Sequence, residues 1–196
     1  MEVPAPTTPP PLETPPPLET AEAKQTAGTI SWVRDLFLSV LIAIVVILFL
    51  YQPVKVEGTS MQPSLENDER VFINKFLYRF GISDIKRGDT VVFWYPNDLS
   101  KSYIKRVIGL PGDRVELRFG KVYVNGQLLQ EPYVPDHFRD RSTMPEKVIS
   151  PDEFFVLGDH RSSSNDSRQG WTVARANIYG KAVFAYWPLD RLGTVR

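Results

Sequence analysis

Three short strand patterns follow one another in the stretch Arg114-Val115-Glu116-Leu117-Arg118-Phe119-Gly120-Lys121-Val122-Tyr123-Val124-Asn125-Gly126-Gln127-Leu128-Leu129. Polar and apolar residues alternate over 114–118 and 121–124, which is the period of a strand with one buried face. Phe119-Gly120 gives a turn between them, and Asn125-Gly126 is a strong signal for a type I′ hairpin. Strands joined by such tight turns pair antiparallel, so this stretch predicts an antiparallel β-sheet.

More strand patterns lie on both sides of this stretch. Runs of β-branched, aromatic or alternating residues predict strands at 70–76, 90–95, 101–108, 153–157 and 181–187. Residues 131–146 are rich in Pro, Asp and Arg and predict a loop. We therefore expect a mainly β fold, an antiparallel β-sheet domain that covers residues 53–196.

An uncharged segment precedes these strands. The nineteen residues from Leu36 to Val54 carry no formal charge. A helix from Trp32 to Tyr51 would be about 30 Å long, close to the thickness of the hydrocarbon core, with aromatic residues at both interfaces. The run is apolar on every side, unlike a core helix, and no A-x-A site of a cleavable signal follows it. We predict one transmembrane helix over 32–52.

The first 31 residues have a different composition. Eight of the first twenty are Pro. Such a segment cannot bury enough apolar surface to offset the entropy lost on ordering. Residues 1–31 therefore predict a disordered, proline-rich tether.

The overall composition excludes several classes of function. The chain has 23 Lys and Arg against 23 Asp and Glu, which is not the basic balance of a nucleic-acid-binding protein. It has no Cys and two His, so a thiol nucleophile is excluded and a multi-histidine metal centre nearly so. We expect no metal, no cofactor and no nucleic-acid partner.

Three polar blocks contain the residue types of a hydrolase. They are Val56-Glu57-Gly58-Thr59-Ser60-Met61-Gln62-Pro63-Ser64-Leu65, Tyr103-Ile104-Lys105-Arg106 with Gly109-Leu110-Pro111-Gly112-Asp113, and Gly158-Asp159-His160-Arg161-Ser162-Ser163-Ser164-Asn165-Asp166-Ser167-Arg168. A serine hydroxyl is a poor nucleophile until a base takes its proton. The residues alone leave two bases open, His160 in a Ser-His-Asp triad or a neutral lysine.

A lysine can serve as this base only if its surroundings disfavour the ammonium. Moving its pKa from about 10.4 to near 8 takes roughly 3 kcal/mol, which burial among apolar groups can supply. Lys105 fits this requirement better than any other lysine, because Tyr103 and Ile104 precede it and Val107 and Ile108 follow it.

In this order, the three blocks resemble those of the bacterial type I signal peptidases, membrane-anchored serine proteases with a Ser-Lys dyad. The resemblance covers roughly residues 32–188 and implies the same β fold, with a small insertion at about 114–150. It implies that Ser60 is the acylating nucleophile and Lys105 the general base. The supporting residues that it implies are Ser164, which holds the lysine amine, the Asp166–Arg168 ion pair, which braces the site, and Gly158 and Asp159, which open the last loop.

The resemblance also implies the substrate and the partners. Signal peptides of exported preproteins would be cut after small residues, with the substrate added as a strand beside 53–60 and 102–105. The pockets would be lined by Val54, Val56, Leu65, Val71, Val92, Tyr103 and Ile104. Membrane lipid and the export machinery are the other expected partners. The tail would lie in the cytoplasm and the catalytic domain on the outer, periplasmic side of the plasma (inner) membrane.

Two departures from the family pattern affect the details of the site. Gly58 stands where some members carry a serine that donates to the oxyanion, so the hole would rest on the Ser60 amide, with the Thr59 hydroxyl as a second candidate donor. His160 and Ser163 stand where Asn is commoner in the family.

Two other functions fit parts of the pattern. A self-cleaving Ser-Lys regulator shares the β core, but the predicted membrane helix and the lack of an N-terminal DNA-binding module weigh against it. A membrane-tethered β domain could bind extended peptides without cutting them. The set of Ser60, Lys105 and Ser164 weighs against that, because a binding module has no use for a buried lysine.

Overall fold

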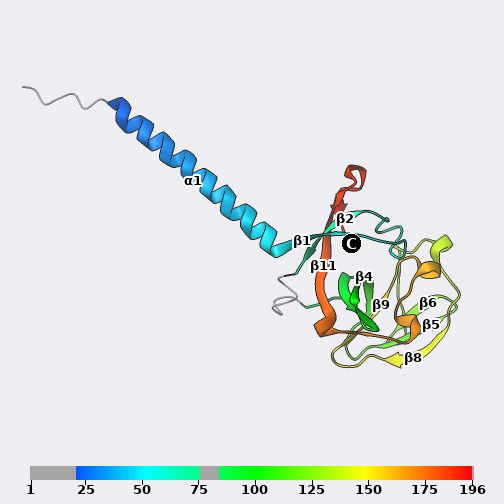
Figure 1. The fold of residues 1–196 in the computed structure, drawn as a ribbon. Helices are drawn as coiled ribbons and strands as arrows, with labels where there is room; N and C mark the ends of the chain where they lie inside the picture. The colour runs from blue at the N-terminus through cyan, green and yellow to red at the C-terminus, as the bar shows by residue number, and fades with distance from the viewer. Residues whose placement is uncertain (1–20, 76–83, 196) are drawn as a thin grey trace, which may run out of the picture. The chain divides into compact units, whose positions relative to one another are not determined.

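The structure is a computed structural model that describes residues 21–75 and 84–195. The chain divides into two compact units, 1–45 and 46–196. Most of helix α1 (Ala21–Leu50) belongs to the first unit, and the strands belong to the second (Figure 1).

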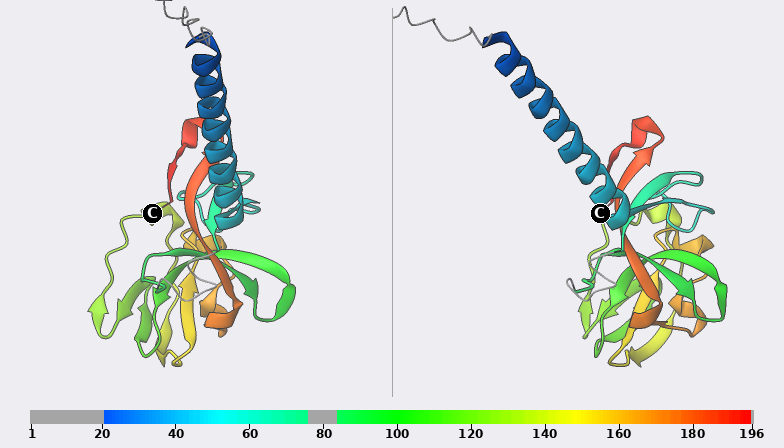
Figure 2. Two further views of the ribbon diagram at one scale, coloured as in Figure 1. Left: turned by 90° about the vertical axis from the view of Figure 1, so that its left-hand side faces the viewer. Right: turned by 60° about the vertical axis from the view of Figure 1, so that its left-hand side comes forward.

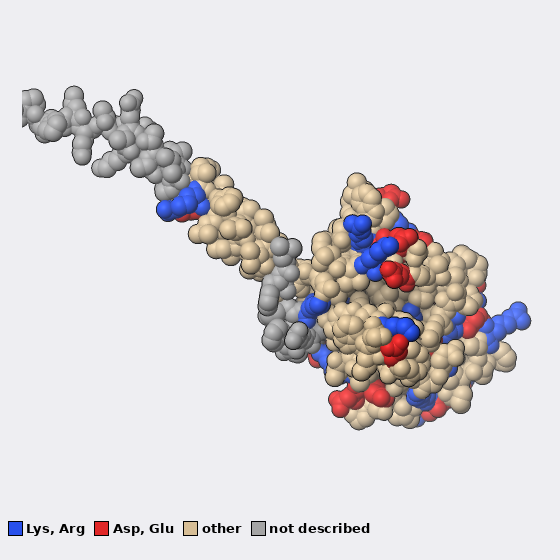
Figure 3. Space-filling view, in the orientation of Figure 1, with Lys and Arg blue, Asp and Glu red and all other residues tan. Residues whose placement is uncertain are grey.

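Helix α1 differs from the predicted helix at both ends. Residues 21–31, expected in the tail, are helical, whereas residues 1–20 lie outside the described part of the chain. Tyr51 and Gln52, expected to end the helix, belong to a strand instead. From Trp32 to Ile47 the side chains are exposed, and beyond Arg34 and Asp35 the helix surface carries no charge (Figure 3).

In the residues that the structure describes, no helix has an apolar run of the length needed to cross a membrane.

The larger sheet has eight strands among the described residues. Their order is β1-β2-β11-β3-β4-β9-β10, with β12 paired to β11, and every pairing is antiparallel. The strands are β1 (Tyr51–Lys55), β2 (Arg70–Asn74), β3 (Thr90–Tyr95), β4 (Asp98–Gly109), β9 (Glu153–Leu157), β10 (Val173–Ala174), β11 (Ile178–Trp187) and β12 (Gly193–Thr194). Strand β1 therefore lies at one edge of this sheet.

The smaller sheet has the order β7-β6-β5-β8. Its strands are β5 (Arg114–Arg118), β6 (Lys121–Val124), β7 (Gln127–Leu128) and β8 (Met144–Val148). Asn125 and Gly126 have φ angles of 52° and 80°, the positive values that a type I′ turn requires. The predicted loop at 131–146 was wrong at its end, because Met144 opens strand β8, which pairs with β5.

Short 3₁₀ turns connect several of the strands. They are η1 (Asp136–Phe138), η2 (Arg161–Ser163), η3 (Ser167–Gln169), η4 (Arg175–Asn177) and η5 (Leu189–Arg191). The second and third of these shape the loop that follows β9.

In the part of the chain that the structure describes, three apolar clusters form the core. Because side chains alternate along β3, Val92 faces one side of the large sheet while Val91 and Phe93 face the other. The Val92 side is covered by the segment after β1, through Met61 and Leu65. A third cluster joins β4 and β9 to β5 and β6, so the small sheet packs beside β9 (Figure 2).

Candidate active site

Ser60 lies in the loop that joins β1 to β2. The base of this loop is closed by two backbone hydrogen bonds, from the Val56 amide to the Glu69 carbonyl at 2.8 Å and from the Asp68 amide to the Val56 carbonyl at 2.9 Å. Met61 is 1 % exposed and packs into the core. The loop is thus anchored next to Ser60, which stays half-buried.

Gly58 has a backbone conformation that favours glycine. Its φ is 92°, in the left-handed region, and its amide donates to Asn67 Oδ1 at 2.7 Å. A side chain at this position would strain the loop two residues before Ser60.

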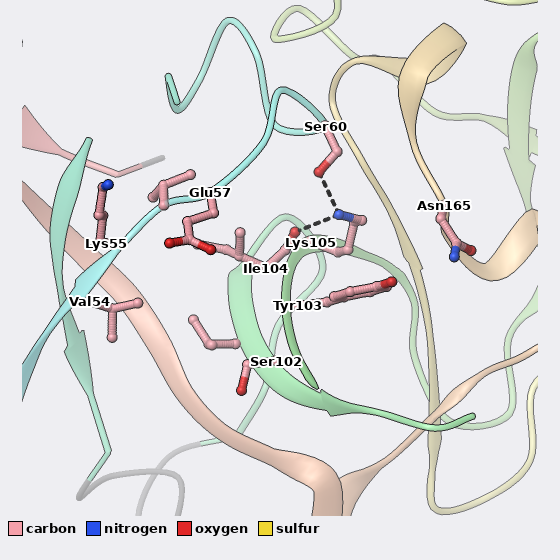
Figure 4. Close-up of a pocket in the computed structure, with 11 residues that line it drawn as sticks. Val54, Lys55, Glu57, Ser60, Ser102, Tyr103, Ile104, Lys105 and Asn165 are labelled. Carbon is pink, nitrogen blue, oxygen red and sulfur yellow. Dashed lines mark hydrogen bonds between the residues drawn. The ribbon is translucent and has the colours of Figure 1, made fainter. Parts of the chain in front are cut away.

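Lys105 reaches Ser60 from strand β4. Its Nζ donates to Ser60 Oγ at 2.6 Å and to the Ile104 carbonyl at 3.0 Å (Figure 4). The Lys105 side chain is buried, and this desolvation lowers its pKa to about 8, against the opposing influence of Asp166 and Asp159. The pair is therefore a hydroxyl beside an amine that loses its proton near neutral pH.

His160 contacts the backbone of the nucleophile loop. Its amide donates to the Ser60 carbonyl at 3.0 Å, and its Nδ1 lies 3.2 Å from the Thr59 carbonyl oxygen. Its ring packs against Phe138, with ring centres 4.1 Å apart. Among the described residues, no hydrogen bond joins the imidazole to Ser60 Oγ.

Gly158 is the point of closest approach between the two loops of the site. A Cβ at this position would lie 2.2 Å from Ser164 Oγ and 2.5 Å from the Ser60 carbonyl oxygen. Any side chain would therefore displace Ser60 or Ser164.

Ser164 does not make the contact that the resemblance implies. Its Oγ is buried and has no hydrogen-bond partner within the described part of the chain. The hydrogen bonds of the Lys105 amine go to Ser60 and Ile104 instead. Ser164 thus lies at the site, through its contact with Gly158, without holding the lysine in this structure.

The expected ion pair between Asp166 and Arg168 is present. Arg168 Nε and Nη2 donate to the two carboxylate oxygens of Asp166, each at 2.8 Å. Asp166 Oδ2 also accepts from the Gly158 amide at 3.1 Å, and Arg168 pairs with Asp140. The pair therefore fixes the backbone of the last loop beside Ser60.

Two further buried ion pairs were missed by the sequence reasoning. Arg106, the neighbour of Lys105, binds both oxygens of Asp159 at 2.8 and 2.6 Å. Arg161 binds Glu131, with an Nη1–Oε2 distance of 3.1 Å, and donates to the Gly158 carbonyl at 3.0 Å. Arg106 stood in a quoted block and could have been suspected, whereas Glu131 lies in a loop without any distinguishing pattern.

A pocket of about 400 Å³ opens beside the Ser60–Lys105 pair. Its lining includes five of the seven predicted pocket residues, namely Val54, Val56, Val92, Tyr103 and Ile104. The other two, Leu65 and Val71, are 1 % and 0 % exposed and lie in the core beneath the sheet surface. The lining residues that the sequence reasoning missed are Lys55, Glu57, Ser102 and Asn165.

The pocket lies between two strands that can accept a further strand. Within 21–75 and 84–195, strand β1 is paired only with β2, at the edge of the sheet. Strand β4 pairs with β9 from Arg106 onward, so the stretch before Lys105 pairs on its β3 side. An extended peptide between these edges would find backbone donors and acceptors on both sides.

Comparison with known proteins gives consistent matches. A family model described as "Signal peptidase, peptidase S26" matches residues 29–187. The chain is 35 % identical over 180 residues to signal peptidase I P of Bacillus subtilis subsp. natto, covering 87 % of this chain and 96 % of that protein. It is 36 % identical over 198 residues to signal peptidase I of Leptolyngbya laminosa, covering 97 % and 93 %. A crystal structure of a signal peptidase I from Enterococcus faecalis V583 aligns with a TM-score of 0.44 and 31 % identity, covering 50 % of this chain and 97 % of that one.

Proposed function

This chain belongs to the signal peptidase family, peptidase S26, and we propose that it cleaves preproteins with Ser60 as nucleophile and Lys105 as general base. As a member of that family it is a serine endopeptidase that acts on preproteins bearing signal peptides. One observation carries the proposed mechanism: a buried amine with a pKa of about 8 lies 2.6 Å from a serine hydroxyl.

Acylation begins when neutral Lys105 accepts the Ser60 proton. Ser60 Oγ attacks the scissile carbonyl carbon, and the carbonyl oxygen becomes an oxyanion. The Ser60 amide, with the Thr59 hydroxyl as a second candidate donor, stabilises that charge. When the intermediate collapses, the C–N bond breaks and the Lys105 ammonium protonates the departing amine.

Deacylation uses the same amine a second time. Lys105, neutral again, takes a proton from a water molecule, whose oxygen attacks the Ser60 ester. The second tetrahedral intermediate releases the carboxylate of the signal peptide, and the proton returns to Ser60 Oγ. The ion pairs of Asp166 and Asp159 hold the last loop in place throughout.

The pocket favours small residues on the acyl side of the cut. Val56 and Val92 are each 3 % exposed and close the pocket floor between β1 and β4. In an extended substrate, the side chains at −1 and −3 point to the same face. Both positions would then face a shallow apolar surface that accepts Ala, which is the A-x-A pattern.

We further propose that helix α1 anchors the enzyme in a membrane. The part of the helix from Trp32 to Leu50 then forms a single span, with the N-terminus in the cytoplasm and the catalytic unit on the outer side of the plasma membrane. Support comes from the uncharged run 36–54, and signal peptidases I are generally membrane-associated. Lipid and the export machinery are the partners that this placement implies.

Cleavage of a defined preprotein tests the function. The full-length protein in detergent is incubated with a preprotein that has Ala at −1 and −3, and the products are identified by mass spectrometry. We expect a single cut after the −1 Ala. Phe at −1 should slow cleavage on the order of ten- to hundredfold, because a steric clash costs about 1–3 kcal/mol. Equal cleavage of the two substrates would contradict the pocket assignment.

Three variants test the residue roles. Lys105→Met keeps length and apolar packing without the amine, so cleavage should fall to background with the fold intact. Lys105→Arg should fail as well, because a guanidinium stays protonated. His160→Ala should keep substantial activity. Activity retained in Lys105→Met and lost in His160→Ala would instead establish a serine–histidine mechanism.

A further inference from the structure

The end of strand β1 and the segment that follows it toward the nucleophile carry two charged side chains at the rim of the pocket. Lys55 and Glu57 both line it, on the side opposite Tyr103 and Ile104 (Figure 4). They are exposed, whereas Val56 between them is buried. The alternation of exposed and buried residues over 55–57 therefore places Val56 toward the core and the two charged side chains on the opposite side of the segment.

The position of Ser60 fixes how a substrate passes these residues. The carbonyl of residue −1 must lie at Ser60 Oγ, and the pocket extends from there past Val56 toward Val54. Residue −3 therefore lies nearer Val54, and the substrate runs parallel to the 54–60 segment. Its −1 and −3 side chains face the apolar floor. The −2 side chain must point the other way, to the face of Lys55 and Glu57.

Glu57 is the carboxylate that lines the pocket on that face, whereas Arg70, the cross-strand partner of Lys55, lies outside the pocket lining. Lys55 Nζ lies 2.6 Å from Asp68, and on β4, next in sequence to the pocket residue Ser102, Lys101 Nζ lies 2.8 Å from Asp98. Both cations are thus matched by carboxylates of their own. In the described residues, Glu57 has neither a hydrogen bond nor an ion pair, so its carboxylate is available to a substrate.

We propose that Glu57 makes this enzyme select a basic residue over an acidic one at substrate position −2. The inference rests on the proposed function and adds a second element of specificity to it, alongside the size selection at −1 and −3. The carboxylate attracts a Lys or Arg side chain and repels Asp or Glu. Each effect is that of an exposed ion pair, so we expect roughly a fivefold preference for Lys over Glu in kcat/KM.

Three matched substrates measure this preference. They share one signal sequence with Ala at −1 and −3 and differ only at −2, which is Lys, Gln or Glu. For the native full-length protein in detergent at low salt, kcat/KM should fall in that order. At about 1 M salt the order should largely disappear, because the screening length falls to about 3 Å.

Two substitutions locate the effect at Glu57. Glu57→Gln should bring the Lys-to-Glu ratio close to one, and Glu57→Lys should reverse it. Glu146→Gln removes an exposed carboxylate of strand β8, which is not among the pocket residues, so the ratio and the activity should stay those of the native protein. The comparison separates a local charge from the net charge of the protein. The ratio is internal to each variant, so it does not depend on how much of the preparation is active.

The possible outcomes distinguish a failure of the proposed role of Glu57 from a failure of the proposed peptidase function. Cleavage of the Gln substrate after the −1 Ala together with equal rates for the Lys and Glu substrates would overturn the role of Glu57 alone. The same holds if the preference persists in Glu57→Gln. Failure of the native protein to cut any of the three substrates would overturn the proposed function itself.

Discussion

Lys105 is an ionisable side chain that the fold buries. The side chain is 4 % exposed, between the ring of Tyr103 and the Ser60 loop, and its burial lowers its pKa from 10.5 to about 8. A difference of this size between folded and unfolded states corresponds to roughly 3 kcal/mol. The burial that makes Lys105 a usable base therefore also lowers the stability of the folded protein.

This cost predicts how stability depends on pH. Between pH 8 and 10.5 the unfolded chain keeps the Lys105 proton and the folded chain does not, so native stability rises with pH in that window. Below pH 8 the burial penalty is fully present. Lys105→Met lacks it, so the variant should be more stable than the native protein at pH 7, by up to about 3 kcal/mol. The difference should shrink as pH rises to 10.5, as measured by urea unfolding across this range.

Lys101 serves as the control, because its pKa is shifted in the opposite direction to that of Lys105. Lys101 is exposed, and its hydrogen bond to Asp98 raises its pKa above 10.5. Lys101→Met should therefore give no gain in stability below pH 10.5. A Lys105→Met variant that is no more stable than the native protein at pH 7 would show that burial does not disfavour the ammonium.

At the residue scale, the sequence allowed the choice of the candidate base but not the detailed contacts of the residues around it. Apolar residues near Lys105 in the sequence made it the best candidate among the lysines, and the resemblance of its block to the family pattern decided the choice. The burial of Leu65 and Val71 beneath the pocket could not be foreseen, because residues that line a pocket and residues of the core have the same apolar character in the sequence. The unpartnered hydroxyl of Ser164 is likewise set by how closely Gly158 approaches it.

At the scale of elements, the loop after β9 is held by buried ion pairs. Arg161 donates to the Gly158 carbonyl and pairs with Glu131, and both charged side chains are about 2 % exposed. Breaking such a pair leaves an uncompensated buried charge, at a cost of about 3–5 kcal/mol. We therefore expect Glu131→Gln to lose stability on that scale in urea unfolding, and to lose cleavage activity with it.

The same substitution at an exposed pair provides the control. Glu116 pairs with Arg118 on strand β5, where the Arg118 side chain is 55 % exposed. Glu116→Gln should leave the unfolding midpoint near that of the native protein. If both variants unfold alike, the buried pair does not hold the loop.

Strands were predictable where the sequence has an uninterrupted run of β-branched, aromatic or alternating residues. The predicted bounds of β3, β5, β6 and β9 are confirmed. Strands β1 and β8 were missed because Pro53 and Pro145 interrupt them. Proline cannot donate to a sheet and is tolerated at edges, and both strands lie at the edge of their sheet. Edge position is a tertiary property that local sequence does not reveal.

At the scale of the whole molecule, the mainly β, antiparallel character followed from the turns and alternation. The strand order did not, because β2 pairs with β11, more than a hundred positions later in the sequence. The site depends on that order. Ser60 comes from the loop before β2, and Lys105 from β4, which β11 and β3 separate from β2 in the sheet. The transmembrane span stays a prediction.

The pH dependence of kcat/KM for the full-length protein tests the Ser60–Lys105 mechanism most directly. Only the neutral amine can accept the Ser60 proton, so below the pKa of Lys105 the rate constant should fall tenfold per pH unit. We expect a rising limb that levels off near pH 8, unchanged in His160→Ala. A rising limb that is lost or displaced in His160→Ala would contradict the mechanism, because the histidine and not the lysine would then be the base.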